Sequence, residues 1–287
     1  MVDLRQAFFT RSDPEGSGGT ITFNGGTLRL TGTTTTGQAL AIRLTGGKVD
    51  ASGNVLYLTG TITGDGANGT GTLTISGTGG GSVYLNGTDL VPIYVDPTGT
   101  LRGTGLILGN TTVAGTLSPG NSPGTLTFAA PVTIQSTGAQ ALDIDGTGTG
   151  NGAGNYSRVI VTGGNTYTAG GTLAPKLRGI TYASGEVQGT NSYTPALGQK
   201  FTGVIQADGG VLGSFDRLTQ PEGLRAGTRF DTVYNPTSVD LYVTPAAYGN
   251  LAAAGVDQTD NQARVGGALD AIRPAAGVRT RRDQGSV

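Results

Sequence analysis

The stretch from Leu101 to Phe128, LRGTGLILGNTTVAGTLSPGNSPGTLTF, constrains the fold more than any other part of the chain. Hydrophobic residues occur there singly or in short runs, and each run is followed within a few residues by Gly, Asn or Ser-Pro. This pattern predicts short strands at Thr100–Ile107, Thr112–Ala114 and Thr125–Phe128. Because proline fixes φ and glycine tolerates positive φ, Ser118–Gly124 is predicted to form a pair of turns. Strands this short, separated by tight turns, are typical of a parallel β-helix.

The segment from Gly18 to Thr88 shows the same pattern as weak repeats of the form GTLxLxG. Apolar residues alternate with threonine in 20–23, 27–30 and 72–75, which predicts strands with one apolar and one threonine face. Glycine accounts for 53 of 287 residues and charged residues for only 13%, a composition that disfavours helix and favours strands with turns. The uneven spacing of the repeats suits β-helix rungs with variable loops better than a sandwich.

The motif LSPGNSPGTLTF, preceded by LxGTGxxxGNxxVxG, resembles the passenger stem of bacterial autotransporters, which are type V secreted proteins. Four later segments resemble strands and turns of the same family in the same order, and they are 156–163, 199–205, 209–215 and 239–243. Ser157-Arg158 departs from the family pattern, which has an acidic residue at this entry. The resemblance covers 101–243 and implies the autochaperone end of a passenger.

The fold predicted from pattern and resemblance is all-β, a right-handed parallel β-helix with a β-rich C-terminal cap and a short C-terminal helix. We expect a flexible segment at 1–17, β-helix rungs at 18–100, an autochaperone-like end at 101–245, and at 246–287 a linker with a helix at about 259–273 and a disordered tail. The residues expected to seed folding through their burial are Leu117, Leu126, Phe128, Val159, Val161, Phe201, Ile205, Phe215, Leu241 and Val243.

The predicted helix begins with a capping box formed by Thr259 and Gln262, and Pro274 ends it. Its apolar residues recur at i, i+3, i+4 and i+7, and they are Val265, Ala268, Leu269 and Ile272. By resemblance it is the linker helix that threads the translocator barrel. The alternative is an amphipathic cap on the open end of the solenoid.

The resemblance also implies a function and a location. The chain would be the non-enzymatic stem of a passenger that is exposed on the cell surface or secreted, after export through the periplasm of a Gram-negative bacterium. The stem would seed β-helix folding during outer-membrane translocation and present an adhesive region. Its partners would be a translocator β-barrel at the outer membrane, which the chain lacks, and the outer-membrane assembly machinery. The N-terminus lacks the features of a signal peptide, so an exported chain is expected to begin downstream of its signal. The residues after Pro274 are too few for the strands of a barrel, so we expect either a passenger fragment or a truncated gene product.

The composition excludes several kinds of site. The chain has no His and no Cys, which removes Ser-His-Asp and Cys-His catalysis and the usual zinc sites. The Gly-rich strings lack G-K-[ST], and Asp143-x-Asp145 lacks the glutamate that ends a calcium loop, with both carboxylates expected on a solvated strand face. A net charge of −1 gives no excess of basic residues that would indicate binding to nucleic acid. No catalytic residue, cofactor or metal is predicted.

Two other functions stay open. One is an adhesin that recognises host or matrix glycans either through its Thr/Asn-rich flank or through the loops Gly146–Asn155 and Glu186–Thr194. The other is a carbohydrate-active β-helix, either a lyase or a phage-spike-like protein, which needs paired carboxylates. Its candidates are Asp65, Asp89, Asp96, Asp143, Asp145, Glu186, Asp208, Asp216 and Glu222. Five tyrosines either stack on sugars or pack at the rim, namely Tyr84, Tyr94, Tyr156, Tyr167 and Tyr193.

Overall fold

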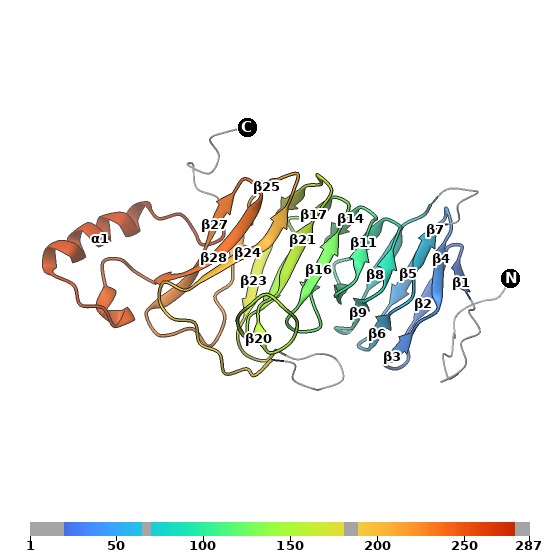
Figure 1. Cartoon of the computed structure of the whole chain (residues 1–287), viewed down its shortest axis with the longest axis horizontal. Coiled ribbons are helices and arrows are strands. Elements are labelled where there is room, and N and C mark those ends of the chain that lie inside the picture. Colours follow the sequence, from blue (N-terminus) through green and yellow to red (C-terminus); the bar gives the residue numbers. More distant parts are fainter. Residues whose placement is uncertain (1–19, 65–69, 181–188, 279–287) are drawn as a thin grey trace.

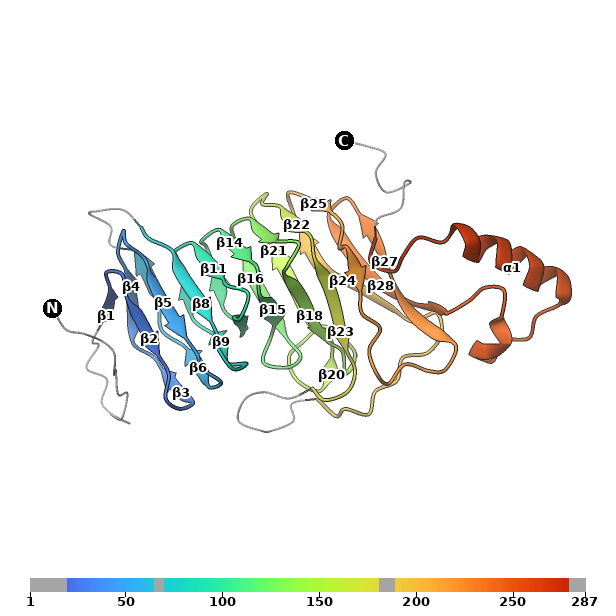
Figure 2. The same ribbon diagram turned by 180° about the vertical axis from the view of Figure 1, so that it is seen from behind.

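A computed structural model of the chain describes residues 20–64, 70–180 and 189–278. The described part is elongated, with strands stacked along its length and a single α-helix projecting from the C-terminal end (Figures 1 and 2). The predicted flexible segment at 1–17 and the residues from 279 onward lie outside the described part. No helix in the described ranges is long and apolar enough to cross a membrane.

Successive strands enter three sheets in rotation, and neighbouring strands within each sheet run parallel until β28. The first sheet contains β1 (Thr20–Phe23), β4 (Ala39–Ile42), β7 (Ile62–Gly64), β10 (Thr88–Asp89), β13 (Leu106–Ile107), β16 (Thr125–Phe128), β21 (Arg158–Val161), β24 (Lys200–Ala207), β28 (Ser238–Pro245) and β27 (Thr228–Asn235). The second contains β2 (Thr27–Arg29), β5 (Gly47–Asp50), β8 (Leu73–Ser76), β11 (Ile93–Val95), β14 (Thr111–Val113), β17 (Val132–Ile134), β22 (Tyr167–Ala169) and β25 (Val211–Gly213).

The third sheet contains β3 (Thr34–Thr36), β6 (Val55–Leu58), β9 (Ser82–Leu85), β12 (Thr100–Gly103), β15 (Thr116–Pro119), β18 (Ala139–Asp143), β23 (Thr172–Lys176) and β26 (Arg217–Leu218). A further pair, β19 (Gly146–Gly148) and β20 (Gly154–Asn155), lies in a side loop. We call β1 to β26, without this pair, the stack. The arrangement confirms the predicted all-β fold of stacked parallel strands and is consistent with a parallel β-helix, whose right-handedness stays a prediction.

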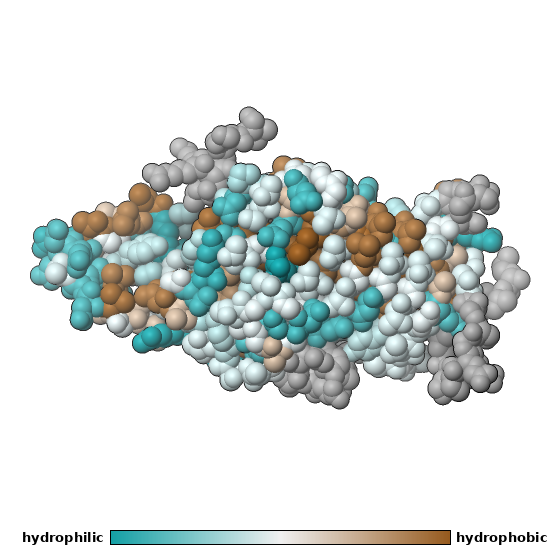
Figure 3. All heavy atoms as spheres, in the orientation of Figure 1, coloured by the Kyte–Doolittle hydropathy of each residue, from teal (hydrophilic) through white to brown (hydrophobic). Residues whose placement is uncertain are grey.

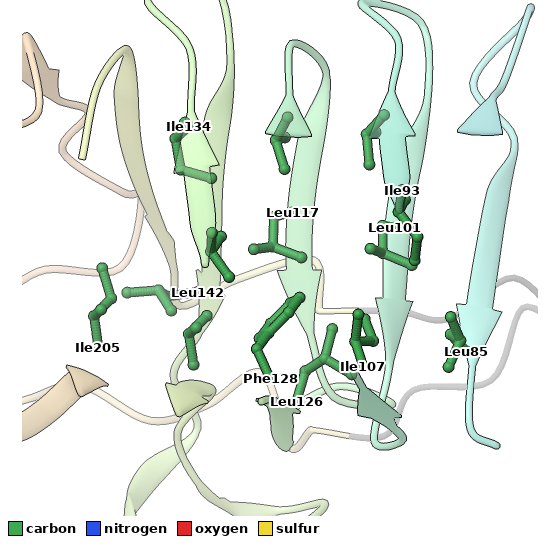
Figure 4. Packing of buried hydrophobic residues seen from close by; sticks show 14 of the residues in the cluster. Leu85, Ile93, Leu101, Ile107, Leu117, Leu126, Phe128, Ile134, Leu142 and Ile205 are labelled. Carbon is green, nitrogen blue, oxygen red and sulfur yellow. The ribbon is translucent and has the colours of Figure 1, made fainter. Parts of the chain in front are cut away.

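The core of the stack consists of inward-facing side chains that lie above one another in register (Figure 4). In the first sheet Ile107 is paired with Phe128, and Phe128 with Val161. The number of residues per turn varies widely, from 16 between Leu101 and Leu117 to 46 between Val161 and Ala207. Extra residues are therefore accommodated in the loops between strands, while the inner files stay in register.

One strand predicted in the stretch Leu101–Phe128 is divided in the structure. The segment Thr100–Ile107 was predicted as one strand, but β12 and β13 belong to different sheets. The chain turns a corner at Gly103, which has φ +117° and lies so close to Leu85 that a Cβ would be 2.1 Å from the Leu85 carbonyl oxygen. Only glycine fits this corner without displacing the neighbouring rung.

Each of the three sheets ends differently at the C-terminal side. In the first sheet β28 pairs antiparallel with β24, and β27 pairs antiparallel with β28. In the second sheet the Val211 amide of β25 donates to the Pro236 carbonyl, and in the third the Leu218 amide of β26 donates to the Ala276 carbonyl. We call β24, β27, β28 and the segment 274–278 the closed end.

The helix α1 (Asp260–Ile272) follows a short 3₁₀ helix, η1 (Leu251–Ala254). The predicted capping box is confirmed, because the Thr259 hydroxyl accepts from the Gln262 amide and the Gln262 side chain accepts from the Thr259 amide. After the helix, residues 274–278 return to the stack, where Ala276 packs against the core.

Candidate functional site

The residues predicted to seed folding are all buried, with at most 1% of the surface of each exposed. Three of them, Leu126, Val159 and Ile205, form one file in the first sheet, which Val239 of β28 continues. Phe201 lies opposite Leu241 in the same antiparallel pair. The predicted burial is confirmed, whereas the role in folding stays a prediction.

An aromatic cluster lies where the last parallel strands meet the antiparallel pair. The ring of Phe201 is 5.4 Å from that of Tyr156, 6.3 Å from that of Tyr193 and 5.9 Å from that of Phe230, all edge to face. Such pairs stabilise beyond the area they bury, by about 0.5–1.5 kcal/mol each. Phe201 was predicted from the sequence but Phe230 was not, although β27 alternates apolar and polar residues around it.

A charged network fixes the irregular pairing between β24 and β28. The register shifts between Phe201 and Ile205, and the Gly203 amide there donates to the buried Asp240 carboxylate at 2.6 Å. The Lys200 ammonium lies 3.0 Å from the other Asp240 oxygen, to which the Asn235 side chain also donates. Hydrogen bonds to Tyr242 and Asp240 raise the pKa of Lys200, which stays charged. Asp240 was missed because strand alternation does not indicate a bulge.

A second set of polar contacts joins β27 to the segment 274–278. The Tyr234 hydroxyl accepts from the Phe215 amide at 2.9 Å and donates to the Gly277 carbonyl. At the outer edge of β27, the Gln220 side chain accepts from the Phe230 amide and donates to the Phe230 carbonyl. This side chain occupies backbone groups that would otherwise pair with another strand.

The helix α1 is attached through its polar face. Gly266 is buried against the Tyr248 backbone, and the Asp270 carboxylate accepts from the amides of Tyr248 and Gly249. These two hydrogen bonds lower the pKa of Asp270. The Arg273 guanidinium lies 4.5 Å from the centre of the Tyr248 ring and also pairs with Asp231 of β27.

The apolar residues predicted on this helix face solvent. Val265 is 55% exposed, Leu269 48% and Ile272 79%, and Ala268 is exposed as well. Figure 3 shows hydrophobic patches on this end of the molecule. The alternative of an amphipathic cap over the end of the stack is therefore wrong, because residues 274–278 and the antiparallel strands occupy that position instead.

The two aspartates expected on a solvated face are buried, so that expectation is wrong. Asp143 accepts from the Ser122 hydroxyl at 2.9 Å and lies 4.0 Å from the Arg102 guanidinium. Asp145 accepts from the Thr190 hydroxyl at 2.7 Å and from the backbone amides of 154 and 191. Burial raises the pKa of the Asp145 carboxyl, but these hydrogen bonds outweigh it and hold the pKa below its usual value. Both carboxylates are thus engaged with the protein itself.

The tyrosines considered for sugar stacking are buried or half-buried. Tyr84, Tyr156 and Tyr167 are buried, and the Tyr167 hydroxyl donates to the side chain of Gln140 inside the core. Tyr94 and Tyr193 are half-buried. No group of three or more acidic residues that could hold a metal occurs within 20–64, 70–180 and 189–278. Asp65 and Glu186 lie outside the described residues.

The loops proposed for glycan recognition are bound to the stack or to themselves. The side-chain amide of Asn155 donates to the carbonyls of residues 151, 152 and 153, which holds the loop 146–155 together. In the second loop, residues 189–194 are described, and Thr190 and Asn191 bind Asp145. Residues 186–188 lie outside the described part.

A shallow polar groove lies near the N-terminal end of the stack, with a volume of about 480 Å³. Hydroxyls and backbone groups dominate its lining. It is lined by Gly25, Gly26, Thr27, Leu44, Thr45, Gly46, Gly47, Lys48, Thr72 and Thr74.

Comparison with known proteins gives no assignment, since no protein-family model and no curated protein sequence matches the chain.

Proposed function

We propose that the chain is the non-enzymatic stem of a surface-exposed or secreted β-helical passenger whose closed end seeds folding of the rungs. The observation that carries the proposal is the asymmetry between the two ends. The strands β24, β27 and β28 have eight residues each, whereas β1 to β9 have three or four. The ladder between β27 and β28 is continuous from Thr228 to Asn235.

Local pairing of this kind forms early because little loop-closure entropy is lost. β27 and β28 are joined by only Pro236 and Thr237, so their contacts are close in sequence. Each parallel rung, in contrast, must close a long turn before any pairing stabilises it. A hairpin that folds first offers β24 an edge, and further rungs then add one at a time toward the N-terminus.

The order of folding suits export in which the C-terminal part of the passenger emerges first. Rungs that fold outside the outer membrane cannot slide back through a narrow pore. In this proposal the partners are a translocator β-barrel and the outer-membrane assembly machinery, and the exposed residues Val265, Leu269 and Ile272 of α1 are the part that contacts the barrel.

The test is pulse-labelling hydrogen exchange with mass spectrometry during refolding of the purified full chain. We expect peptides from β24, β27 and β28 to become protected before peptides from β4 to β9. The variant Phe215→Ala, which removes a fully buried ring 6.4 Å from Tyr167, should slow protection at both ends. The matched control Leu40→Ala removes a buried side chain near the N-terminal end and should slow protection only there. Simultaneous protection, or earlier protection of the N-terminal rungs, would contradict the proposal.

A second candidate function is glycan binding at the polar groove. The groove offers the hydroxyls of Thr27, Thr72 and Thr74 together with backbone groups, which suits a neutral saccharide. The test is a glycan array with the wild-type chain and with Thr74→Val, with Thr133→Val of the same sheet as the control. Binding unaffected by Thr74→Val would exclude the groove.

A further inference from the structure

One acidic residue occupies a core position of the stack. In the first sheet the inner file runs through Leu40, Ile62, Asp89, Ile107 and Phe128. Asp89 is fully buried, and both of its neighbours in the file are buried isoleucines. The carboxyl therefore lies where every other turn in this part of the file carries an apolar side chain.

The surroundings of Asp89 stabilise its charge very little. One carboxyl oxygen, Oδ1, accepts from the Val91 amide at a long 3.4 Å, and Oδ2 has no hydrogen-bond partner. Transfer of a charged carboxylate into such an apolar site is very unfavourable, so the neutral acid is the favoured form. Burial raises the pKa of Asp89 to about 7, and the hydrogen bond from Val91 offsets only part of this effect.

No titratable group within the described residues faces Asp89 from the strands around it. The paired strands β7 and β13 contain no titratable residue, and neither do Thr88, Leu90 and Val91 beside it. In the other two sheets, β8 has none, and β11 carries only Tyr94 between two inward-facing residues. Tyr84 of β9 and Arg102 of β12 likewise alternate with core residues and bind each other on the outer side.

The strand that carries Asp89 has few paired positions with its neighbours. β10 has only two residues, and it pairs with β7 through the single register position Asp89–Ile62. Its pairing with β13 adds two positions. By comparison, β1 pairs with β4, and β16 with β21, over four positions each. Among the described residues, the buried acid therefore coincides with the fewest paired positions between neighbouring strands of the first sheet.

We propose that Asp89 makes the joint between β7, β10 and β13 a pH-dependent weak point in the stack. With a neutral carboxyl the N-terminal rungs, β1 to β9, stay bound to the rungs that follow. With an ionised carboxyl the joint opens and the N-terminal rungs separate locally. The inference does not depend on the proposed role in export.

The sign of the pH dependence follows from linkage. The pKa of Asp89 is about 7 in the folded chain against an ordinary value of 3.8, so the folded joint binds the proton more tightly than the open one. Its stabilisation is complete below about pH 4 and is lost as the pH rises toward and through 7. Between these two pKa values each pH unit favours the open joint about tenfold, and above the folded pKa the effect levels off because both states are then ionised.

The experiment is native-state hydrogen exchange with mass spectrometry on the full chain at pH 5.5 and pH 8.0, with rates divided by the intrinsic exchange rate at each pH. We expect protection of peptides from β4 to β10 to fall about 30-fold at pH 8.0, while peptides from β24 and β28 change little. In Asp89→Asn the difference between the two pH values should disappear. Asp89→Leu provides a second test with an apolar side chain, should the asparagine variant fold poorly.

The matched control is Asp208→Asn, which removes an exposed carboxyl beside the same sheet and should keep the wild-type pH response. Equal protection of the N-terminal rungs at both pH values in the wild-type chain would overturn the proposal. A pH response that persists in Asp89→Asn or in Asp89→Leu would overturn it as well.

Discussion

The N-terminal rungs and the closed end are built from the same kinds of residue but are stabilised in different ways. Among β1 to β9, neighbouring strands pair over three or four positions, and most strands contribute one or two apolar side chains to the core, although β3 consists of threonines. At the closed end, eight-residue antiparallel strands are combined with clustered aromatic rings and a buried charged network. A rung depends on its neighbours, whereas the closed end contains most of its own contacts.

The closed end also shows how a stack of parallel strands is terminated. A parallel edge exposes a row of backbone groups that can accept another strand. Here an antiparallel hairpin, the carbonyl of Pro236 and the carbonyl of Ala276 cover the three edges separately. Each device uses residues from the last part of the chain, so that part has to be in place before the last rungs are covered.

Loss of the central aromatic ring should have the largest effect on this difference. Phe201→Ala removes the ring that contacts Tyr156, Tyr193 and Phe230, and we expect it to cost about 3–5 kcal/mol of unfolding free energy. Urea unfolding, followed by the fluorescence of the tyrosines, measures this cost. Leu56→Ala, a buried control in β6, should chiefly increase local opening of the N-terminal rungs. The comparison would fail if both variants destabilised the whole chain equally.

Removal of the Asp240 carboxylate should have the next largest effect. Asp240→Ala leaves the Gly203 amide without its acceptor and Lys200 without its ion pair, at a cost of about 1–3 kcal/mol. Asp216→Ala, which removes an exposed carboxyl that accepts from the Gly171 amide, serves as the control and should cost less. Chemical denaturation of both variants measures the loss of unfolding free energy. An equal loss would show that the network around Asp240 stabilises the chain no more than a single surface hydrogen bond.

Removal of the Tyr234 hydroxyl should loosen the returning segment without unfolding the hairpin. Tyr234→Phe deletes the bonds to the Phe215 amide and the Gly277 carbonyl, and we expect a loss of about 1 kcal/mol. Hydrogen exchange of the peptide containing 274–278 should increase, while β28 stays protected. Tyr242→Phe on the neighbouring strand is the control, and the same increase in that variant would refute the assignment.

Changes to the exposed side of the helix should have the smallest effect. Leu269→Ser and Ile272→Ser should alter the unfolding free energy by no more than about 0.5 kcal/mol, because both side chains already face water. Binding of an apolar dye such as ANS should fall in these variants. A marked loss of stability would mean that Leu269 and Ile272 pack against the rest of the chain in solution.

The sequence predicts the repetitive features of this fold better than its exceptions. Alternation and turn residues predict the stacked strands, and the capping box predicts the start of α1, because both depend on residues that are close in sequence. The burial of Phe201 or Leu241 follows from the same alternation. The corner at Gly103 was missed because a single chain segment does not show how near the preceding rung approaches it.

The polar residues were predicted least well, since their environment depends on distant segments. Asp143 ends β18 and Asp145 lies in the bend that follows, and the residues that bind them, such as Ser122 and Thr190, are far away in the chain. Asp89 was named only as one of several sparse carboxylates. Its position inside the core becomes visible only through its register with Ile62 and Ile107.

The closed end makes the two ends of the stack different, so that one end of a molecule cannot pair with the opposite end of another. For two copies to stack in parallel, the C-terminal end of one copy would have to offer a parallel strand edge to the open edge of the other. That end offers an antiparallel hairpin instead, with the Gln220 side chain bound to the outer edge of β27. Head-to-tail stacking is the geometry that produces unlimited filaments, whereas contact between two identical edges produces closed pairs. Any self-association by strand pairing should therefore stop at two copies.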